Sequence, residues 1–225
     1  DLCKLCHSKK NYVLPIGNIN GKILLVGEAP GAEEDIHGKP FQGPSGKLLY
    51  KAVLESGINT EDVAITNVCM CRPPNNRTPS KEEMQTCVPY LMWFINQMLN
   101  LKVIVLLGST PLMAVLKLQR IMDKRGSFMN KDGRTFLPTM HPAAALRNMN
   151  LYPLLVSDLR TAFLHASGQI EYGSYKLIDT TDAATRILDR LEQVEEVALD
   201  IETGSENEPD FQHDPILGCL LYTSD

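Results

Sequence analysis

The sequence lacks any long apolar run, and this excludes a membrane-spanning helix as an organising element. No stretch approaches the roughly 18 apolar residues that such a helix needs, and Val103–Leu107, one of the longest runs, has the length of a strand. A basic and then apolar N-terminal leader is also missing, so nothing marks the chain for secretion. We therefore expect a cytoplasmic protein without membrane contacts. The first residue is Asp1 and not Met, so we expect a fragment or a processed chain.

Internal repeats and low-complexity stretches are absent too, and 225 residues suffice for one full domain and part of another.

Acidic residues are scarce in the first three quarters of the chain and frequent in the last quarter. Residues 1–168 carry 19 Lys and Arg against 13 Asp and Glu, a balance of +6, whereas residues 169–225 carry 3 against 14, a balance of −11. We place a domain boundary there, between 1–168 and 169–225. A basic first domain suits a phosphate backbone, although a modest positive charge is also usual for a solvated surface.

Short apolar runs alternate with helical patterns through the first domain. Ser80 and Glu83 form a capping box before the longest helical pattern, and Pro89 inside it predicts a kink or a break. The alternation predicts a three-layer α/β/α domain around a four-stranded, mainly parallel sheet. We expect strands at 22–26, 63–68, 103–107 and 134–140, and helices at 46–55, 80–99, 109–118 and 151–166.

Three polar motifs begin where expected strands end. Gly27 follows the first strand, Asn67 lies at the end of the second, and His141 follows the fourth. Ligands of parallel α/β sheets bind beyond the carboxyl ends of the strands. The three motifs are therefore expected to form one site.

Six cysteines in such a chain favour metal ligands or free thiols over disulfides. Cys3 and Cys6 form a C-x-x-C pair, and Cys71 and Cys87 are separated by fifteen residues. Four thiolates suit either zinc or an iron–sulfur cluster, and the long second spacing fits a zinc ribbon less well. The alternative is that Cys71 and Cys87 are only buried thiols, as we expect for Cys219.

The motifs and cysteines together resemble the iron–sulfur uracil-DNA glycosylases of family 4, over roughly residues 1–167. The motifs are GEAPGAEED at 27–35, NVCMCRPPNNRTP at 67–79 and HPAAALR at 141–147. The resemblance implies a uracil-DNA glycosylase-like fold, uracil-containing DNA as the partner of a monomeric enzyme, and a [4Fe–4S] cluster. The implied cluster ligands are Cys3, Cys6, Cys71 and Cys87, with Cys69 as an additional cysteine.

The resemblance also implies roles in base recognition. Phe41 would stack on a flipped-out uracil, and Asn67 would read its N3–H and O4 edge. His141 would donate a hydrogen bond to O2, where negative charge develops. Each residue has a plain alternative as a core or loop residue.

The first motif and its neighbours would complete the site. Glu34 would orient the attacking water with Glu28 beside it, while Glu33 and Asp35 are expected to face solvent. The small residues Gly27 and Ala29 would let the backbone approach the ligand. Phosphate contacts are expected from Ser45, Arg72, Arg77 and Arg147. GPSGK at 43–47 lacks the spacing of a nucleotide phosphate loop, and Pro44-Ser45 departs from the family pattern.

The second segment contains LDIET at 199–203, which resembles the first motif of DnaQ-like 3′–5′ exonucleases in polymerase I-type DNA polymerases. Asp200 and Glu202 would face one side of a strand and could hold Mg²⁺ or Mn²⁺, although two solvated carboxylates are the plain alternative. We expect the start of a ribonuclease H-like domain, with strands at 175–179, 197–201 and 217–223 and a helix at 181–193. The later residues of a metal site would lie beyond Asp225, so this segment should show no exonuclease activity.

Three hypotheses follow. The first is a monofunctional uracil-DNA glycosylase, forming the N-terminal module of a bacterial or phage DNA polymerase. The second is a catalytically silent, uracil-recognising or DNA-binding module of such a polymerase. The third is a zinc-ribbon nucleic-acid binder, which a brown iron–sulfur chromophore would exclude.

Overall fold

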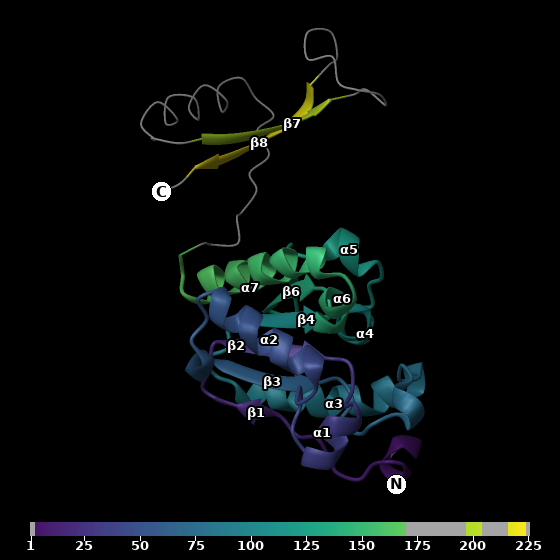
Figure 1. The fold of residues 1–225 in the computed structure, drawn as a ribbon. Helices are drawn as coiled ribbons and strands as arrows, with labels where there is room; N and C mark the ends of the chain where they lie inside the picture. Colours follow the sequence, from purple (N-terminus) through teal and green to yellow (C-terminus); the bar gives the residue numbers. More distant parts are fainter. Residues whose placement is uncertain (1–2, 170–196, 204–215, 224–225) are drawn as a thin grey trace. The chain divides into compact units, whose positions relative to one another are not determined.

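A computed structural model describes residues 3–169, 197–203 and 216–223 of a chain that divides into two compact units, 1–172 and 173–225. The first unit is built on a six-stranded sheet with the order β1-β3-β2-β4-β6-β5 (Figure 1). Its strands are β1 (Ile16–Gly17), β2 (Ile23–Gly27), β3 (Val63–Asn67), β4 (Val103–Leu107), β5 (Met129–Lys131) and β6 (Arg134–Thr139).

The four central strands, β3, β2, β4 and β6, run parallel, as the alternating pattern predicts. Every residue of β2, β3 and β4 is buried. Burial on both faces explains the continuous apolar runs of β2 and β4, whereas β3 ends in two buried polar residues, Thr66 and Asn67. Successive side chains point to opposite faces. On β2, Ile23 and Leu25 enter one core cluster, and Leu24 and Val26 enter the other.

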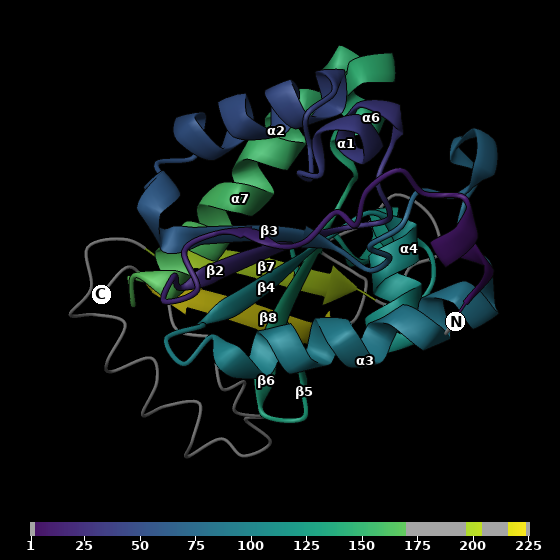
Figure 2. The same ribbon diagram turned by 90° about the horizontal axis from the view of Figure 1, so that it is seen from below.

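Helices cover both faces of the sheet, which confirms the three-layer architecture. In Figure 2, α2 and α7 lie over one face and α3 lies over the other. The helices are α1 (Ala32–His37), α2 (Pro44–Glu55), α3 (Lys81–Gln97), α4 (Ser109–Pro111), α5 (Ile121–Lys124), α6 (Pro142–Arg147) and α7 (Tyr152–Ala166).

The expected strand number was wrong, since the sheet has six strands instead of four. The two additional strands lie at the edges and run antiparallel, β1 against β3 and β5 against β6. They contain only two and three residues. Such short strands show no recognisable alternation in the sequence, because a period of two needs several residues to emerge.

Two expected helices differ from the structure. The one at 109–118 is a single turn of α4 followed by a π-helical turn, Leu112–Leu116, which ends at Lys117 in the left-handed conformation. The other, α3, does not break at Pro89. Pro89 lies on the exposed side of the helix, where water can satisfy the carbonyl that loses its N–H partner. The predicted capping box is confirmed: Ser80 Oγ accepts from the Glu83 amide at 3.2 Å, and the Glu83 carboxylate accepts from the Ser80 amide at 2.7 Å.

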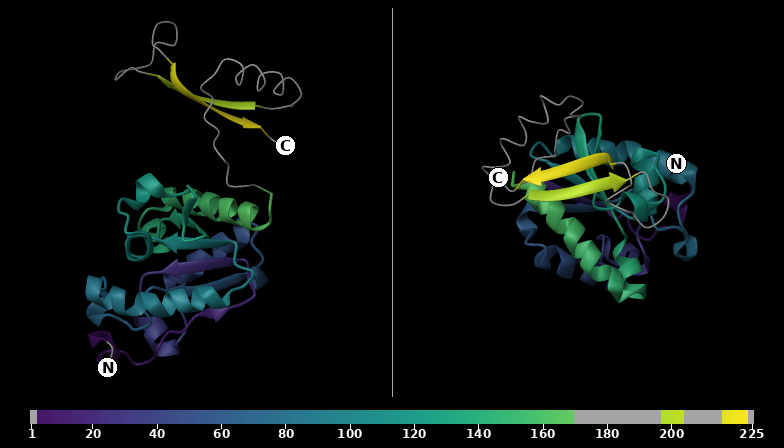
Figure 3. Two further views of the ribbon diagram at one scale, coloured as in Figure 1. Left: turned by 180° about the vertical axis from the view of Figure 1, so that it is seen from behind. Right: turned by 90° about the horizontal axis from the view of Figure 1, so that it is seen from above.

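In the second unit the structure describes two antiparallel strands, β7 (Val197–Thr203) and β8 (Ile216–Thr223), visible side by side in Figure 3. They match the strands expected at 197–201 and 217–223. The expected strand at 175–179 and helix at 181–193 lie outside the described residues. Among the described residues, no helix is long and apolar enough to cross a membrane.

Candidate active site

The three motifs meet at the carboxyl ends of the parallel strands. Gly27 and Asn67 are the last residues of β2 and β3 and are direct neighbours in the sheet register. His141 follows β6 and begins α6. Gly108, after β4, adopts a φ of +101°, and a Cβ on it would lie 3.1 Å from the His141 Cβ. Because Gly108 has no side chain, the backbone at Gly108 can pass close to His141.

Phe41 joins this group from the loop between α1 and α2. Its ring stacks against the ring of His141, with centroids 5.9 Å apart and planes 25° from parallel. A Cβ added to Gly27 would lie 2.6 Å from the Phe41 ring and 2.4 Å from Asn67 Oδ1. Gly27 is thus required for close packing, and Phe41, Asn67 and His141 surround one point at the strand ends.

The backbone of Phe41 is held in a conformation that a bulky residue rarely adopts. Its φ is +55°, in the left-handed region, although its side chain is 5 % exposed. Gly46 contacts its carbonyl so closely that a Cβ there would lie 1.8 Å from the oxygen. Strained backbone of this kind concentrates at functional sites.

Asn67 is a buried polar residue at the end of β3, where its side chain faces Gly27. Asn67 is 3 % exposed, and a Cβ on Gly27 would lie 2.4 Å from its Oδ1. Its amide carries one acceptor and two donor hydrogens. The side chain thus places both kinds of hydrogen-bonding group at the carboxyl end of the strand.

His141 is held in one tautomer by its position at the start of α6. Its Nδ1 accepts a hydrogen bond from the Ala143 amide at 3.1 Å, so the proton of the neutral ring lies on Nε2. Burial lowers the pKa of His141 to about 4, with a further contribution from the positive charge of Arg147 and an opposing one from Glu34. The ring is therefore a neutral Nε2–H donor at physiological pH.

The two glutamates proposed for the first motif have different partners. Glu34 Oε1 accepts from the amides of Gln42 at 2.9 Å and Gly43 at 3.1 Å, and its Oε2 accepts from Gly31 at 3.0 Å. Its carboxylate thus fixes the loop that carries Phe41. Glu28 accepts from the Thr110 hydroxyl at 2.5 Å, which links the ends of β2 and β4.

Asp35 is buried, so the expectation that it faces solvent was wrong. Its side chain is among the most buried carboxylates, at 2 % exposure, and Oδ1 accepts from the amides of Lys10 at 2.8 Å and Asn11 at 3.2 Å. Both donors lie in the segment before β1, residues 3–15, which we call the N-terminal arm. No local sequence pattern therefore indicates them. Glu33 is exposed, as expected.

The residues expected at phosphates lie in different settings. Arg77 forms a bidentate pair with Glu83, at 2.7 and 2.8 Å, and Arg72 donates to Asn76 at 2.7 Å. Arg72 thus has its partner in the loop before α3, and Arg77 has its partner in the first turn of α3. Arg147 is exposed in the last turn of α6, close enough to influence His141, and Ser45 is half-buried in the first turn of α2.

The structure gathers the five cysteines of the first unit on one side of the sheet. Cys69 and Cys71 belong to the core cluster beneath α3, and Cys3, Cys6 and Cys87 pack against it. Cys71 is close to Cys6, and Cys69 is close to Cys87, where its hydrogen bond lowers the pKa of the Cys87 thiol. Within the described residues, no three His, Cys, Asp or Glu side chains are arranged around a single metal position.

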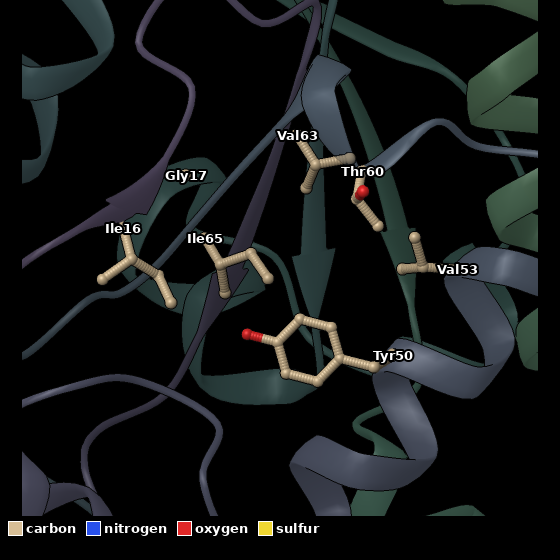
Figure 4. Close-up of a pocket in the computed structure, with 7 residues that line it drawn as sticks. All are labelled: Ile16, Gly17, Tyr50, Val53, Thr60, Val63 and Ile65. Atoms are coloured by element: carbon tan, nitrogen blue, oxygen red, sulfur yellow. The ribbon is translucent and has the colours of Figure 1, made fainter.

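Other candidate sites contribute less. The apolar crevice of about 90 Å³ in Figure 4 lies beside Tyr50, Val63 and Ile65, and none of the motif residues lines it. On β7, Asp200 pairs with Leu220 and Glu202 with Gly218 in the backbone register.

Thr110 was not anticipated as a residue of the candidate site. It too follows the end of a strand, and this position in the sequence is the signal that could have revealed it.

Comparisons with known proteins identify the family of this chain. The profile of the uracil DNA glycosylase superfamily matches residues 14–164. A type-4 uracil-DNA glycosylase of Thermotoga maritima is 42 % identical over 165 residues, which cover 71 % of this chain and 85 % of the relative. One from Saccharolobus solfataricus is 44 % identical over 168 residues, covering 70 % and 77 %. A DNA polymerase of Bacillus phage SP01 is 30 % identical over 144 residues, covering 64 % of this chain and 16 % of the polymerase. The chain therefore belongs to the uracil-DNA glycosylase superfamily, as a member of its type-4 family.

Proposed function

We propose that this chain is a uracil-DNA glycosylase that hydrolyses the N-glycosidic bond of deoxyuridine in DNA, without cutting the strand. The observation that carries the proposal is the convergence of three side chains at the carboxyl ends of the strands. The amide of the buried Asn67, the neutral Nε2–H donor of His141 and the ring of Phe41, whose backbone has a φ of +55°, lie together there. This set can stack a flipped-out base, read one edge of it and stabilise charge on it.

Each pocket residue has a role that follows from its chemistry. Phe41 stacks on the uracil ring, and the Asn67 amide offers an acceptor to N3–H and a donor to O4. Cytosine presents a different edge, with an acceptor at N3 and a donor at C4, so the amide favours uracil. When the bond from C1′ to N1 breaks, its electron pair leaves with uracil, and the charge is shared with O2. His141 Nε2–H stabilises that charge chiefly in the transition state.

Glu34 is proposed to orient the attacking water in addition to fixing its loop. A carboxylate has about four lone-pair sites, two on each oxygen. Both sites on Oε1 are used by Gln42 and Gly43, whereas Oε2 accepts from Gly31 alone among the residues that the structure describes. The remaining site on Oε2 is therefore where a water would bind. Glu28, held by Thr110, is proposed to shape the pocket beside it.

We propose that four cysteines hold an iron–sulfur cluster, which their number and their gathering on one side of the sheet support. Cys3, Cys6, Cys71 and Cys87 come from the arm, the loop after β3 and helix α3, so one [4Fe–4S] group would join three separate segments. Cysteine thiolates are the ligands of such clusters. The cluster would supply a structural crosslink and no chemistry at the base. Iron and sulfide analysis of anaerobically purified protein tests this, and zinc alone would contradict it.

Cys69 is the alternative to Cys71 in the ligand set, because its thiol is buried and lies beside Cys87. If Cys71 is the ligand, Cys71→Ser should lose most of the iron and Cys69→Ser should keep it. The reverse result would assign the ligand to Cys69. The two variants make the same chemical change two residues apart, so each controls for the other.

The proposed substrate is DNA that contains uracil, bound by a monomer in the cytoplasm. Arg147 and Ser45 flank the pocket and are proposed to contact phosphates beside the flipped nucleotide. Arg77 is less suited to this task, since its guanidinium already binds Glu83 in a bidentate pair.

The match to a phage DNA polymerase favours a second proposal, that the chain is the N-terminal module of such a polymerase. The segment with Asp200 and Glu202 would then begin a DnaQ-like exonuclease domain that uses Mg²⁺ or Mn²⁺. In that setting the first unit could excise uracil or only recognise it.

A gel assay on a uracil-containing oligonucleotide, followed by alkali cleavage, decides between these functions. The parent should excise uracil, and His141→Ala should excise it at least about a hundredfold more slowly while binding the same DNA nearly as well. His165→Ala is a matched control, because His165 also packs against a phenylalanine ring, at 43° to its plane, but lies near the end of α7. A full rate in His141→Ala would refute its role. A parent that binds uracil-DNA without excising it would support the silent module.

A further inference from the structure

Two consecutive carboxylates of the short helix α1 bind different parts of the molecule. Glu34 accepts amide hydrogen bonds from Gly31, Gln42 and Gly43, the residues on either side of α1 and beside Phe41. Asp35 accepts amide hydrogen bonds from Lys10 and Asn11, which lie in the N-terminal arm. Helix α1 thus contacts the base pocket through one residue and the arm through the next.

The contact between arm and helix is reciprocal. While Asp35 accepts from the arm backbone, the Asn11 side chain donates to the carbonyls of Asp35 at 2.8 Å and Ile36 at 3.1 Å. The arm runs alongside α1 in Figure 1. Four hydrogen bonds therefore join two segments that are about 24 residues apart in sequence.

The other end of the arm belongs to the cysteine cluster. The arm contains Cys3 and Cys6, and it is tied to the loop of Cys71. The Val13 amide donates to the Met70 carbonyl at 2.9 Å, and the Ser8 hydroxyl donates to the Arg72 carbonyl at 3.3 Å. Any group that holds the cysteines in place therefore also fixes the segment that Asp35 binds.

Burial makes the Asp35 contact strong. A carboxylate at 2 % exposure must have its charge satisfied by hydrogen bonds, and N–H bonds to an ionised acceptor are stronger than neutral ones. Within a helix of six residues, Glu34 and Asp35 cannot shift independently. A displacement of the arm would therefore move Glu34, and with it the amides of Gln42 and Gly43.

We propose that α1 couples the cysteine arm to the uracil pocket, with Asp35 as the positioning residue of this contact. The coupling explains how a cluster remote from the base can affect the pocket without taking part in the chemistry. As a mechanism for excision it rests on the proposed function, whereas the mechanical coupling itself can be measured without any excision.

The first measurement is amide hydrogen exchange of the segment 38–46. In Asp35→Ala, exchange at Gln42 and Gly43 should accelerate about tenfold or more, because local opening controls exchange. Asp35→Asn keeps an acceptor oxygen and should restore protection to within about threefold. Glu33→Ala is the matched control, since it removes the same charge from an exposed position of the same helix, and it should exchange like the parent.

The second measurement separates pocket placement from loss of the cluster. In Asp35→Ala, the single-turnover excision rate should fall about tenfold or more while iron per chain stays at the parent value. Asn11→Ala removes bonds across the same contact without exposing a buried carboxylate. In Asn11→Ala the excision rate should fall and the exchange should accelerate, both by less than in Asp35→Ala. The fold loss of excision rate in the double variant should be smaller than the product of the two single fold losses.

Three results would overturn the coupling. One is parent-like exchange at Gln42 and Gly43 in a folded Asp35→Ala protein. Another is an excision rate that falls only in proportion to lost iron, and the third is an Asp35→Asn variant as impaired as Asp35→Ala. If the parent excises no uracil but exchange responds as described, the proposed function fails and the coupling stands. If Asp35→Ala does not fold, Asn11→Ala decides through the same exchange measurement.

Discussion

The depressed pKa of His141 predicts an unusual dependence of uracil excision on pH. Burial lowers this pKa from the ordinary 6.5 to about 4, and Arg147 contributes in the same direction. Since one pKa unit corresponds to 1.36 kcal/mol, the folded environment favours the neutral ring by about 3 kcal/mol. The neutral ring carries its proton on Nε2, because Nδ1 is occupied by the Ala143 amide.

The difference is largest between pH 5 and 6. At pH 5.5 a histidine with a pKa of about 4 is roughly 97 % neutral, whereas one with a pKa of 6.5 is only about 9 % neutral. If excision requires the neutral ring, its single-turnover rate should be nearly the same at pH 8 and pH 5.5 and should fall as the pH approaches 4. An ordinary histidine would instead reduce the rate about tenfold at pH 5.5.

Two measurements test this reasoning together. Single-turnover excision of a uracil oligonucleotide gives the pH profile, and the NMR shift of the His141 ring protons gives its titration directly. Because the unfolded chain takes up the proton first, stability should also decline as the pH falls from 6.5 towards 4. A rate that halves near pH 6.5 together with a ring that titrates there would refute both the buried position and the neutral-donor role of His141.

Three further variants test the pocket and its frame. Asn67→Asp replaces the amide donor with a carboxylate, so excision should slow at least about tenfold and discrimination between uracil and cytosine should change, as measured on paired oligonucleotides. Gly27→Ala places a methyl group 2.6 Å from Phe41 and should weaken affinity for free uracil in a competition assay; unchanged affinity would mean that the pocket is looser than described. Asp158→Ala leaves the Arg125 guanidinium without its bidentate partner, so urea unfolding should show a loss of about 3–5 kcal/mol, and an unchanged midpoint would contradict the buried ion pair.

The parallel core of the fold could be predicted because its signals are local. β4 was expected at its observed bounds, Val103–Leu107, since a strand buried on both faces must be apolar at every position. The start of α3 was equally clear, because the capping box needs only Ser80 and Glu83. The edge strands β1 and β5 could not be predicted, since pairing at a sheet edge depends on the neighbouring strand and leaves little trace in two or three residues.

The position of the candidate site could be predicted from topology, but the state of its residues could not. The carboxyl ends of parallel strands share one edge, so Gly27, Asn67 and His141 were expected to meet there. The tautomer of His141 depends on the Ala143 amide, and the backbone conformation of Phe41 depends on its close contact with Gly46. Arg77 was expected to contact phosphate. Its bidentate pair with Glu83 could not be predicted, because two residues that are six positions apart need not meet in this geometry.

The acidic run of the first motif shows why composition alone misjudges such a segment. Its carboxylates have the same chemistry, yet each has a different environment: Glu28 binds the Thr110 hydroxyl, Glu33 is exposed, Glu34 binds the pocket loop and Asp35 binds the N-terminal arm. Most donors to the buried carboxylates are backbone amides, which every sequence supplies and no sequence pattern marks. A solvated surface would tolerate replacement of all four residues. Here Glu28, Glu34 and Asp35 each hold a separate segment near the candidate site. The charge of this motif therefore serves chiefly to position the backbone. Of its four carboxylates, Glu33 alone belongs to the charged surface that the composition suggests.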